Sequence, residues 1–595
     1  MFRVPGSASV FTLLFPILLS AQVSFDPQQG PQLTPPASNT QPEQRCVVQG
    51  RVTNALTGEP LKKATVNLAR RGTGGPDSGS AYQGYAATSD ADGSFRFESI
   101  EPGDYSLSGH RSGFLRSSYG AKGPMQEGAR LTLSPGQQLT NIDLALTPQG
   151  VITGRVVDDD GDPVDEATIQ ALVRRWTRGK TRYLPHGFSR TNDLGEFRIA
   201  NLQPGRYFLV AQKNRMGHND APASPDKPDI RPVRTFYPDA LSRELAAPIE
   251  IKAGQNLSGM DIHLRTVQTH HVRGHLSGIL PEGNPEDLML NLSPQDEDMP
   301  IWGGRSNINK DRSFDLAGVA PGSYTLSLNV AIGVFRSFAR QTIEVGSTDL
   351  NDVVLNVLPA RSVRGRVQIE GTPPAGASPV NWSRVRVFLT LADQGPYFMG
   401  SDDSVKADGT FVMESVSPGK YNVQVNNGPD GAYLKSVRFG QQEMLGKELD
   451  LSQGAAGELD VVFRYGAAEV DGVAQPAQAA GGSSDSSAPA PASPPAASIV
   501  LIPETLRSDG SGMYFGNTNQ NGAFSIKDVP PGNYRAYAFE HINMGQLENP
   551  DVLKQLESKG TDIEVKENDK KQIQLSIISA DDVQQIFTRL GIESE

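Results

Sequence analysis

The chain contains 595 residues with a hydrophobic content of 37%, 61 glycines, 43 prolines and 7% aromatic residues. This composition favours a turn-rich all-β protein over a helical one, because turns between strands need glycine and proline. Acidic residues outnumber basic residues 67 to 55, and the net charge of -12 argues against binding to nucleic acid or to an anionic membrane.

The N-terminal residues predict export. Arg3 precedes an apolar run from Val10 to Leu19, and the small Ser-Ala pair that follows offers a cleavage site. Residues 1–21 are therefore predicted to be a secretory signal peptide. The apolar run is shorter than the ~20 residues that cross a bilayer, and no later stretch comes closer. We expect an exported chain without a membrane span after signal removal, in the periplasm, at the cell surface or secreted.

Two features follow the predicted signal peptide. Residues 22–44 are rich in proline and glutamine and are predicted to be a flexible leader. Cys46 is the only cysteine, so no internal disulfide is possible. Its place on a predicted strand indicates a buried structural thiol.

A short motif occurs five times along the chain. Each copy has a phenylalanine, six residues, Pro-Gly, one residue and a tyrosine, and successive copies lie roughly 100 residues apart. This spacing indicates tandem sandwich domains instead of a solenoid of short repeats. The copies are Phe95/Pro102/Gly103/Tyr105, Phe197/Pro204/Gly205/Tyr207, Phe314/Pro321/Gly322/Tyr324, Phe411/Pro418/Gly419/Tyr421 and Phe524/Pro531/Gly532/Tyr534.

The motif predicts two strands of a hairpin. In the first copy Phe95 and Phe97 alternate onto one face, and Tyr105 returns on the core side with a hydroxyl that can anchor a backbone group. Pro102 and Gly103 fit the central positions of a type II turn.

A tight turn with positive φ is expected just before the phenylalanine, because four copies carry glycine there. These glycines are Gly93, Gly195, Gly409 and Gly522. The third copy has Arg312 instead, so a different turn is predicted in that copy, since a bulky residue would be strained at positive φ.

Two further patterns flank each copy. An opening strand has glycine between two apolar residues, and two short alternating strands around a polar turn close the unit. The opening triplets are Val48-Gly50-Val52, Ile152-Gly154-Val156, Val272-Gly274-Leu276, Val363-Gly365-Val367 and, more weakly, Val470-Gly472-Ala474. The chain is thus predicted to be all-β, with five tandem immunoglobulin- or transthyretin-like β-sandwich domains at 45–147, 148–266, 267–359, 360–466 and 467–579.

Non-sandwich segments are few. Residues 476–497 form a Pro/Ala/Ser/Gly tract and are predicted to be a disordered loop inside the fifth unit. Asn549 and Pro550 begin a short predicted helix. A C-terminal helix is predicted at 580–595, with a capping-box start and an apolar stripe that either packs on the last sandwich or docks a partner. The stripe consists of Val583, Ile586, Phe587 and Leu590.

The stretches "VQGRVTNALTGEPLKKATVNL" and "SDADGSFRFESIEPGDYSL" resemble the carboxypeptidase regulatory-like domain, a transthyretin-like β-sandwich. The second unit resembles this domain nearly as closely. Units three to five keep the Phe/Pro-Gly/Tyr motif but differ from the domain in the sequence of the opening turn. The resemblance implies a sandwich grouped with carbohydrate-binding-like folds that accompanies metallopeptidases, surface receptors or other β-domains. It implies little about activity.

Catalytic patterns are absent from the sequence. None of the eight histidines has glutamate three residues later, as a zinc carboxypeptidase would need, and no nucleophile elbow or phosphate loop occurs. We therefore expect no enzyme activity, no cofactor and no metal. His263, His270, His271 and His275 cluster in sequence, but alternation separates His270 from His271 and His275.

Residues 158–162, "DDDGD", carry oxygen ligands but lack the spaced ligand set of a calcium loop, which favours a solvated turn.

The best ligand candidate is "RRWTRGKTRYLPHG", residues 174–187. Arginines beside exposed aromatic rings bind sugars or anionic polymers by stacking and charge. The alternative is a hairpin with an outward basic face and inward aromatics. The candidate ligand residues are Arg174, Arg175, Trp176, Arg178 and Tyr183, and Trp302 and Trp382 are open between loop platform and core.

The leading hypothesis is a non-enzymatic exported protein that acts as an extended binding or scaffold array, with a polysaccharide or an envelope protein as candidate partner. Exposed Trp176, Trp302 or Trp382 on a concave face would favour a carbohydrate-binding module array. An exposed C-terminal stripe would favour a regulatory or accessory subunit of a peptidase or outer-membrane complex.

Overall fold

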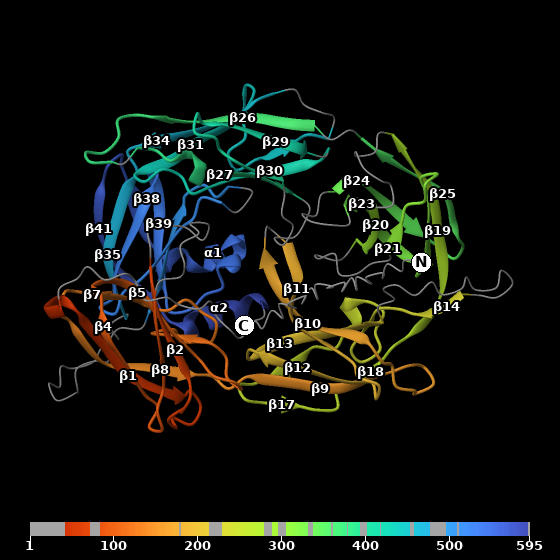
Figure 1. Ribbon diagram of the computed structural model, residues 1–595, viewed down its shortest axis with the longest axis horizontal. Helices are drawn as coiled ribbons and strands as arrows, with labels where there is room; N and C mark the ends of the chain where they lie inside the picture. The colour runs from red at the N-terminus through yellow and green to blue at the C-terminus, as the bar shows by residue number, and fades with distance from the viewer. Residues whose placement is uncertain are drawn as a thin grey trace, which may run out of the picture.

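The computed structural model shows five β-sandwiches that follow one another around a closed ring (Figure 1). The predicted signal peptide, the leader up to residue 41, residues 477–495 of the predicted loop, Arg178 and Trp302 lie outside the described residues. The structure describes residues 42–71, 84–177, 180–213, 229–278, 288–295, 305–330, 337–358, 361–377, 379–392, 401–416, 418–452, 457–476, 496–507 and 511–592.

The first sandwich follows a short 3₁₀ turn, η1 (Pro42–Gln44), and consists of two facing sheets. Its strands are β1 (Cys46–Asn54), β2 (Thr65–Arg70), β3 (Gly84–Thr88), β4 (Ser94–Ile100), β5 (Gly103–His110), β6 (Ser117–Ser118), β7 (Arg130–Leu133) and β8 (Gln138–Leu146). One sheet has the order β4-β1-β8, and the other has the order β3-β2-β5-β6 with β7 also beside β5. β4 pairs with β1 antiparallel, whereas β8 pairs with β1 in parallel.

The second sandwich repeats this plan. Its elements are β9 (Gly150–Val157), β10 (Ala167–Thr177), β11 (Lys180–Arg190), β12 (Glu196–Leu202), β13 (Gly205–Lys213), β15 (Thr235–Phe236), η2 (Arg243–Leu245), β16 (Ile249–Ile251), β17 (Asn256–Leu257) and β18 (Ile262–His263). The sheet β12-β9-β17, with β18 beside β9, faces the sheet β11-β10-β13-β15, with β16 beside β13. In Figure 1 the β10–β11 hairpin points into the middle of the ring.

The third sandwich borrows a strand from the preceding segment. Its strands are β14 (Asp229–Pro232), β19 (Thr266–Gly278), β20 (Leu288–Pro294), β21 (Arg305–Asn307), β22 (Ser313–Val319), β23 (Gly322–Val330), β24 (Ser337–Val345) and β25 (Leu350–Val357). β14–β19–β22, with β25 beside β19, form one sheet, and β21–β20–β23–β24 form the other. β14 lies in the range predicted for the second sandwich, so the exact domain limits stay predictions.

The fourth sandwich has the largest first sheet of the two-sheet units. Its elements are β26 (Arg361–Glu370), η4 (Trp382–Arg384), β27 (Arg386–Leu391), β28 (Ser401–Ser404), β29 (Thr410–Val416), β30 (Lys420–Asn426), β31 (Ala432–Phe439), β32 (Gln442–Glu443), β33 (Glu448–Asp450) and β34 (Leu459–Tyr465). The sheets have the orders β29-β26-β34-β31-β32 and β28-β27-β30-β33.

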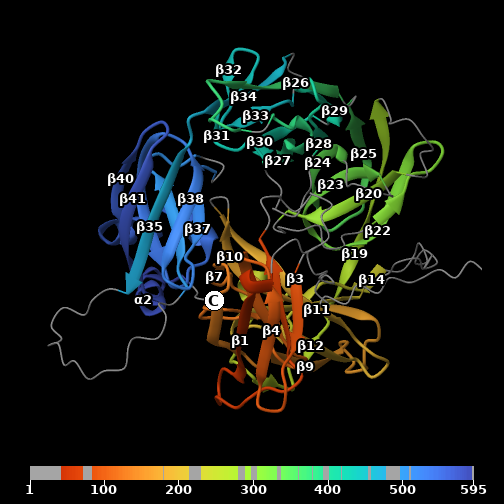
Figure 2. The ribbon, with the colours of Figure 1, turned by 60° about the vertical axis from the view of Figure 1, so that its left-hand side comes forward.

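The fifth sandwich is one seven-stranded sheet that encloses its core. Its elements are β35 (Ala468–Pro476), β36 (Ser498–Pro503), β37 (Tyr514–Asn517), β38 (Ala523–Val529), β39 (Gly532–Phe539), η5 (Met544–Glu548), α1 (Pro550–Leu556), η6 (Glu557–Lys559), β40 (Thr561–Val565), β41 (Lys570–Ile578) and α2 (Ala580–Leu590). The strand order is β37-β36-β39-β41-β35-β38, with β40 beside β39. Figure 2 shows this unit next to the fourth sandwich.

The opening-strand glycine faces the motif phenylalanine in every unit. The pairs in register are Gly50–Phe95, Gly154–Phe197, Gly274–Phe314, Gly365–Phe411 and Gly472–Phe524. A Cβ at these glycines would lie 1.8, 2.3, 1.9, 2.4 and 2.2 Å from carbonyl oxygens of the closing segments, at Ile142, Met260, Val353, Leu459 and Ile573. Glycine is therefore required, because the parallel closing strand approaches the opening strand more closely than any side chain allows.

The motif is not a hairpin in any copy, contrary to the sequence prediction. β4 pairs with β1 in one sheet, while β5 pairs with β2 in the other, so the Pro-Gly segment carries the chain across the core. The same change of sheet occurs at Pro204 between β12 and β13, at Pro321 between β22 and β23, and at Pro418 between β29 and β30.

The fifth copy departs from a hairpin in its own way. Pro531 lies between β38, which pairs with β35, and β39, which pairs with β36, so the two strands of the motif are again not neighbours. Alternation places residues on faces but does not tell which strand is adjacent, and so the wrong partner was predicted in all five copies.

The type II turn predicted at the Pro-Gly pair is also wrong. Gly103 has a φ of 148°, and Gly205 and Gly322 have 154° and 156°, far from the +80° or so that a type II turn needs. The φ of Gly419 and of Gly532 falls outside the range from +20° to +160° altogether.

The motif glycines have an extended backbone because they lie at the start of the next strand. Gly103, Gly205, Gly322 and Gly532 begin that strand, and Gly419 directly precedes it. The proline before each glycine forms a bend that is half-buried or exposed, outside the core. These prolines are Pro102, Pro204, Pro321, Pro418 and Pro531.

The motif tyrosine fastens this crossing. The hydroxyl of Tyr105 donates to the carbonyl oxygen of Glu101 at 2.8 Å, four residues back, as in a tyrosine corner. Burial raises the pKa of Tyr105 and keeps its hydroxyl protonated as a donor. Three further copies make the same bond at 2.9 Å, from Tyr207 to Gln203, from Tyr324 to Ala320 and from Tyr534 to Pro530.

The fourth tyrosine is confirmed as a core residue only. Tyr421 is buried in the fourth core, where the sequence placed it. The residue four positions before it, Ser417, lies outside the described residues. The backbone anchor of the Tyr421 hydroxyl therefore stays a prediction.

The turn before the third phenylalanine is the same as in the other copies, contrary to the sequence prediction. Arg312 has a φ of 68°, close to the 75° of Gly93. Its carbonyl accepts the Leu276 N–H at 2.9 Å and its N–H donates to Asn309 at 2.8 Å, and these two bonds offset the backbone strain.

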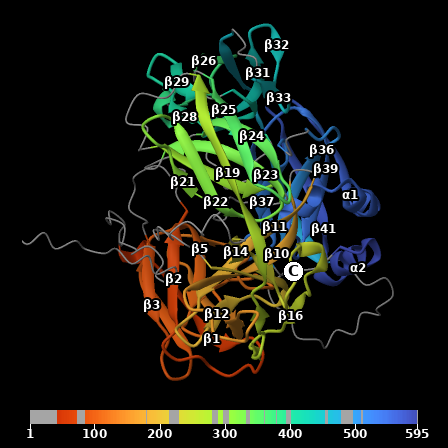
Figure 3. The same ribbon diagram turned by 90° about the vertical axis from the view of Figure 1, so that its right-hand side faces the viewer.

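Both predicted helices and the buried thiol are confirmed, although α2 ends at Leu590, where Gly591 adopts a φ of 64°, and does not continue toward 595 as predicted. The side chain of Asn549 caps α1 at the Asp551 N–H, and that of Ser579 caps α2 at the Asp582 N–H. Cys46 is buried in the first core. The stripe on α2 packs with α1 against the outer face of the fifth sandwich, where the two helices lie side by side (Figure 3).

A direct contact between the first and fifth sandwiches closes the ring, so the array is not extended as the sequence suggested. Arg130 donates its N–H to the Thr518 carbonyl at 3.0 Å, and Gln520 returns a backbone bond to the Arg130 carbonyl at 3.2 Å. The Gln520 side chain accepts the Thr132 N–H at 3.1 Å and donates to the Thr132 carbonyl at 2.9 Å. β7 therefore gains a neighbour from a segment 388 residues away.

Gly274→Ala should lower the free energy of unfolding of the third sandwich by about 1–3 kcal/mol, because the added methyl group overlaps the Val353 carbonyl. Gly346→Ala is the matched control, since its Cβ would meet nothing within 4 Å. Differential scanning calorimetry of the full chain measures both. Equal transition temperatures for the two variants would contradict the close-approach explanation.

Candidate functional site

The hairpin β10–β11 carries the basic aromatic segment singled out from the sequence. Arg174 is exposed, whereas Arg175, Trp176 and Tyr183 are half-buried. The Tyr183 ring meets Phe208 edge-on at 5.1 Å between centroids, and the Arg243 guanidinium lies 4.9 Å from its centre. These contacts occupy the ring of Tyr183 within the second sandwich.

The tip of this hairpin reaches the fifth sandwich. β10 packs on η5, and a Cβ at Gly545 would lie only 2.6 Å from the Trp176 carbonyl oxygen. The indole N–H of Trp176 is buried and has no acceptor among the described residues. The hairpin is thus a contact between the second and fifth sandwiches, and ligand binding by it stays a prediction.

The other sequence candidates lie apart from the hairpin. Trp382 is half-buried against the core of the fourth sandwich, which makes it a packing residue. On α2, Val583, Ile586 and Phe587 are buried. The stripe therefore covers its own sandwich.

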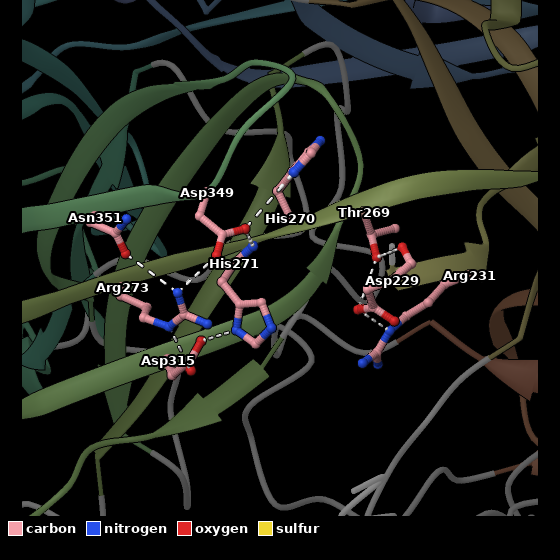
Figure 4. A network of polar contacts seen from close by, with 9 residues as sticks. All are labelled: Asp229, Arg231, Thr269, His270, His271, Arg273, Asp315, Asp349 and Asn351. Carbon is pink, nitrogen blue, oxygen red and sulfur yellow. Dashed lines mark hydrogen bonds and ion pairs between the residues drawn. The ribbon is translucent and has the colours of Figure 1, made fainter. Parts of the chain in front are cut away.

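A polar network connects three strands on the outer face of the third sandwich (Figure 4). Nδ1 of His271 lies 2.6 Å from Oδ1 of Asp315, and the Arg273 guanidinium bonds Asp315 at 3.0 Å and Asp349 at 2.8 Å. Asp349 also accepts the His271 backbone N–H at 3.0 Å, which, together with Arg273, lowers its pKa. Asn351 completes the group as a weak acceptor at 3.4 Å from Arg273.

A second polar group in Figure 4 fastens β14 to β19. Asp229 forms a 2.6 Å ion pair with Arg231, and both side chains are largely buried. Burial opposes ionisation of Asp229, but the bond and charge of Arg231 outweigh it and lower its pKa. Thr269 donates to the Asp229 carbonyl at 2.8 Å. This pair holds the segment that links the second and third sandwiches.

These groups bond to one another and are arranged to hold strands together. Sequence reasoning considered His271 only as a metal ligand, because its partners Asp315 and Asp349 lie 44 and 78 residues away. His270 is buried, while His263 and His275 are exposed. Within the described residues no cluster of three or more His, Cys, Asp or Glu side chains could hold a metal ion.

The turn at 158–162 is built by its first carboxylate. Asp158 accepts the backbone N–H groups of Asp160 at 3.1 Å and Asp162 at 2.9 Å. Its carboxylate therefore stabilises the turn, which agrees with the solvated turn that the sequence favoured over a calcium site.

Comparison with known proteins finds a family model that matches one of the five units. Residues 47–147 match the family model of the carboxypeptidase regulatory-like domain. The first sandwich is therefore similar to carboxypeptidase regulatory-like domains. No curated protein matches the chain. Among the part of the chain that the structure describes, no helix is long and apolar enough to cross a membrane.

Several solved structures are similar to parts of the chain. The Bacillus anthracis TIE protein is 14% identical with a TM-score of 0.15, over 52% of this chain and 51% of that protein, so about half of that protein is spanned. The minor pilin GBS52 of Streptococcus agalactiae is 12% identical with a TM-score of 0.21, over 40% of this chain and 99% of the pilin.

Two B repeat units of the collagen-binding protein of Staphylococcus aureus are 13% identical with a TM-score of 0.13, over 70% of this chain and 99% of the repeats. Likeness at this level carries no argument about function.

Asp349→Asn should weaken the third sandwich by about 0.2–1 kcal/mol at neutral pH, the range of partly exposed ion pairs. Because the folded-state pKa of Asp349 is lowered, its contribution is present above the unfolded pKa of about 4 and is lost as pH falls through the folded value. Urea unfolding between pH 3 and pH 7 measures this.

The control is Asp352→Asn, an exposed carboxylate at a φ of 62° that asparagine tolerates. The two variants should differ from each other at pH 7 and converge on the unsubstituted chain in acid. The same pH dependence in all three proteins would show that Asp349 has no such role.

Proposed function

We propose that the chain is a non-enzymatic binding or scaffold protein that works outside the cytoplasm, at the cell envelope or beyond it. The closed ring carries this proposal, because it fixes five sandwiches in one arrangement and presents their outer faces at constant distances. The signal-like N-terminus supports export. The carboxypeptidase regulatory-like domain supports a non-catalytic role, since such modules accompany other domains.

A carbohydrate-binding array is the second candidate. Exposed Arg174 on the β10–β11 hairpin favours it. The half-buried positions of Trp176 and Trp382 favour it less, because a sugar platform needs an open ring face. A role as accessory subunit of a peptidase or outer-membrane complex has less support, because the apolar stripe on α2 is already covered.

Opening the ring should reduce binding. Gln520→Ala removes the two side-chain bonds to Thr132, and capture of envelope components and glycans by the immobilised chain should then fall several-fold. Gln585→Ala, an exposed glutamine on α2, is the control and should leave capture unchanged. Quantitative pull-down from envelope extract and a glycan array measure it. No retention by the unsubstituted chain in either assay would contradict a binding function.

A further inference from the structure

A pocket of about 290 Å³ lies on the outer face of the second sheet of the first sandwich. Arg71 enters it from the end of β2, where its backbone N–H donates to the Asp104 carbonyl at 2.8 Å. Ser106 lines it from β5 and Ser118 from β6, and the segment that precedes β7 forms the rim. The volume is near the lower end of small-molecule sites, about the size for one sugar ring.

Two guanidinium groups give the pocket a positive character in an acidic protein. Arg71 and Arg116 both line it, both are exposed, and neither has a carboxylate within ion-pair distance among the described residues. Nη2 of Arg116 donates to Ser108 at 3.0 Å, which orients its fork. Glu127 also lines the pocket, where its carboxylate accepts from Asn517 and keeps its negative charge, so the two arginines and this glutamate leave the lining with a net charge of +1. Two guanidinium forks without a carboxylate partner are suited to a ligand carboxylate.

The remaining lining groups favour a ligand with hydroxyl groups. The hydroxyl groups of Ser106 and Ser118 offer donors and acceptors, and Met125, 60% exposed, provides an apolar edge. We infer that this pocket binds a small hydroxylated carboxylate, such as a sugar acid. The inference rests on the proposed binding function and names a ligand class and a site for it, distinct from the β10–β11 hairpin.

The fifth sandwich holds the rim of the pocket in place. Nε2 of Gln126 lies 3.2 Å from Nε2 of His541, and Nζ of Lys122 lies 3.4 Å from Oε1 of Glu540. Gly120 packs against Ala496 so closely that a Cβ there would lie 3.0 Å from the alanine Cβ. Ligand binding is therefore coupled to ring closure, since an open ring would release the rim.

Isothermal titration of the full chain with glucuronate tests the site, with glucose as the uncharged ring and sulfate as the bare anion. Glucuronate should bind saturably at one site and at least ten times more tightly than glucose or sulfate. Arg71→Ala and Arg116→Ala should each weaken glucuronate binding at least tenfold. Arg51→Ala, an exposed arginine on the opposite sheet, should not, and circular dichroism confirms that all variants fold.

Each other outcome counts against the inference. Absence of saturable glucuronate binding, equal binding of glucose, or equal loss in Arg51→Ala would overturn the site, and equally tight sulfate would overturn the ligand class. Gln520→Ala should weaken glucuronate while Gln585→Ala does not, and equal affinities would refute the coupling to the ring. Retained capture of envelope components without glucuronate binding would leave the scaffold function intact and remove this site alone.

Discussion

The fold depends on one close approach that is repeated in every unit. A glycine on the opening strand lies opposite the motif phenylalanine and under a carbonyl of the closing segment, as Gly50 does with Phe95 and Ile142. This space lets the closing strand join in parallel beside the opening strand and complete the core without help from the next unit. Five copies of the motif therefore mean five separate cores, each with its own phenylalanine and its own tyrosine.

Self-contained units can be arranged in many ways, and contacts between them decide the arrangement. Three contacts decide the arrangement here. The Gln520 side chain bonds the backbone of Thr132 as a neighbouring strand would, and β14 joins the sheet of the third sandwich. The β10–β11 hairpin packs on η5. The Asp229–Arg231 pair stabilises the junction after the second unit, and the His271 network holds strands of the third sandwich together. The ring is thus a property of the loops and edges, while the cores stay alike.

The sequence predicted what depends on local pattern. The all-β class, the buried phenylalanines of the motif and the helix caps at Asn549 and Ser579 all follow from spacing and side-chain chemistry, and the structure agrees. Strand partners did not follow, because alternation is the same in a hairpin and in a crossing between sheets. The type II turn predicted at the Pro-Gly pairs was wrong for a similar reason, since the pair suits a tight turn and also the bend through which the chain enters a new sheet. The different turn predicted at Arg312 was wrong because hydrogen bonds to other residues offset the strain of its positive φ.

Ring closure, the Asp315–His271–Asp349 network and the Arg71–Arg116 pocket were beyond the reach of the sequence. Each joins residues too far apart in the chain for any local pattern to show, as Thr132 and Gln520 do across 388 residues. Hydrogen exchange along β7 tests the closed ring most directly, since the strand contains its own reference. The N–H groups of Arg130 and Thr132 donate to the fifth sandwich, whereas alternation turns those of Leu131 and Leu133 toward β5. The closed ring predicts slow exchange at all four amides in the intact chain. Fast exchange at Arg130 and Thr132 beside slow exchange at Leu131 and Leu133 would show an open chain of sandwiches and contradict it.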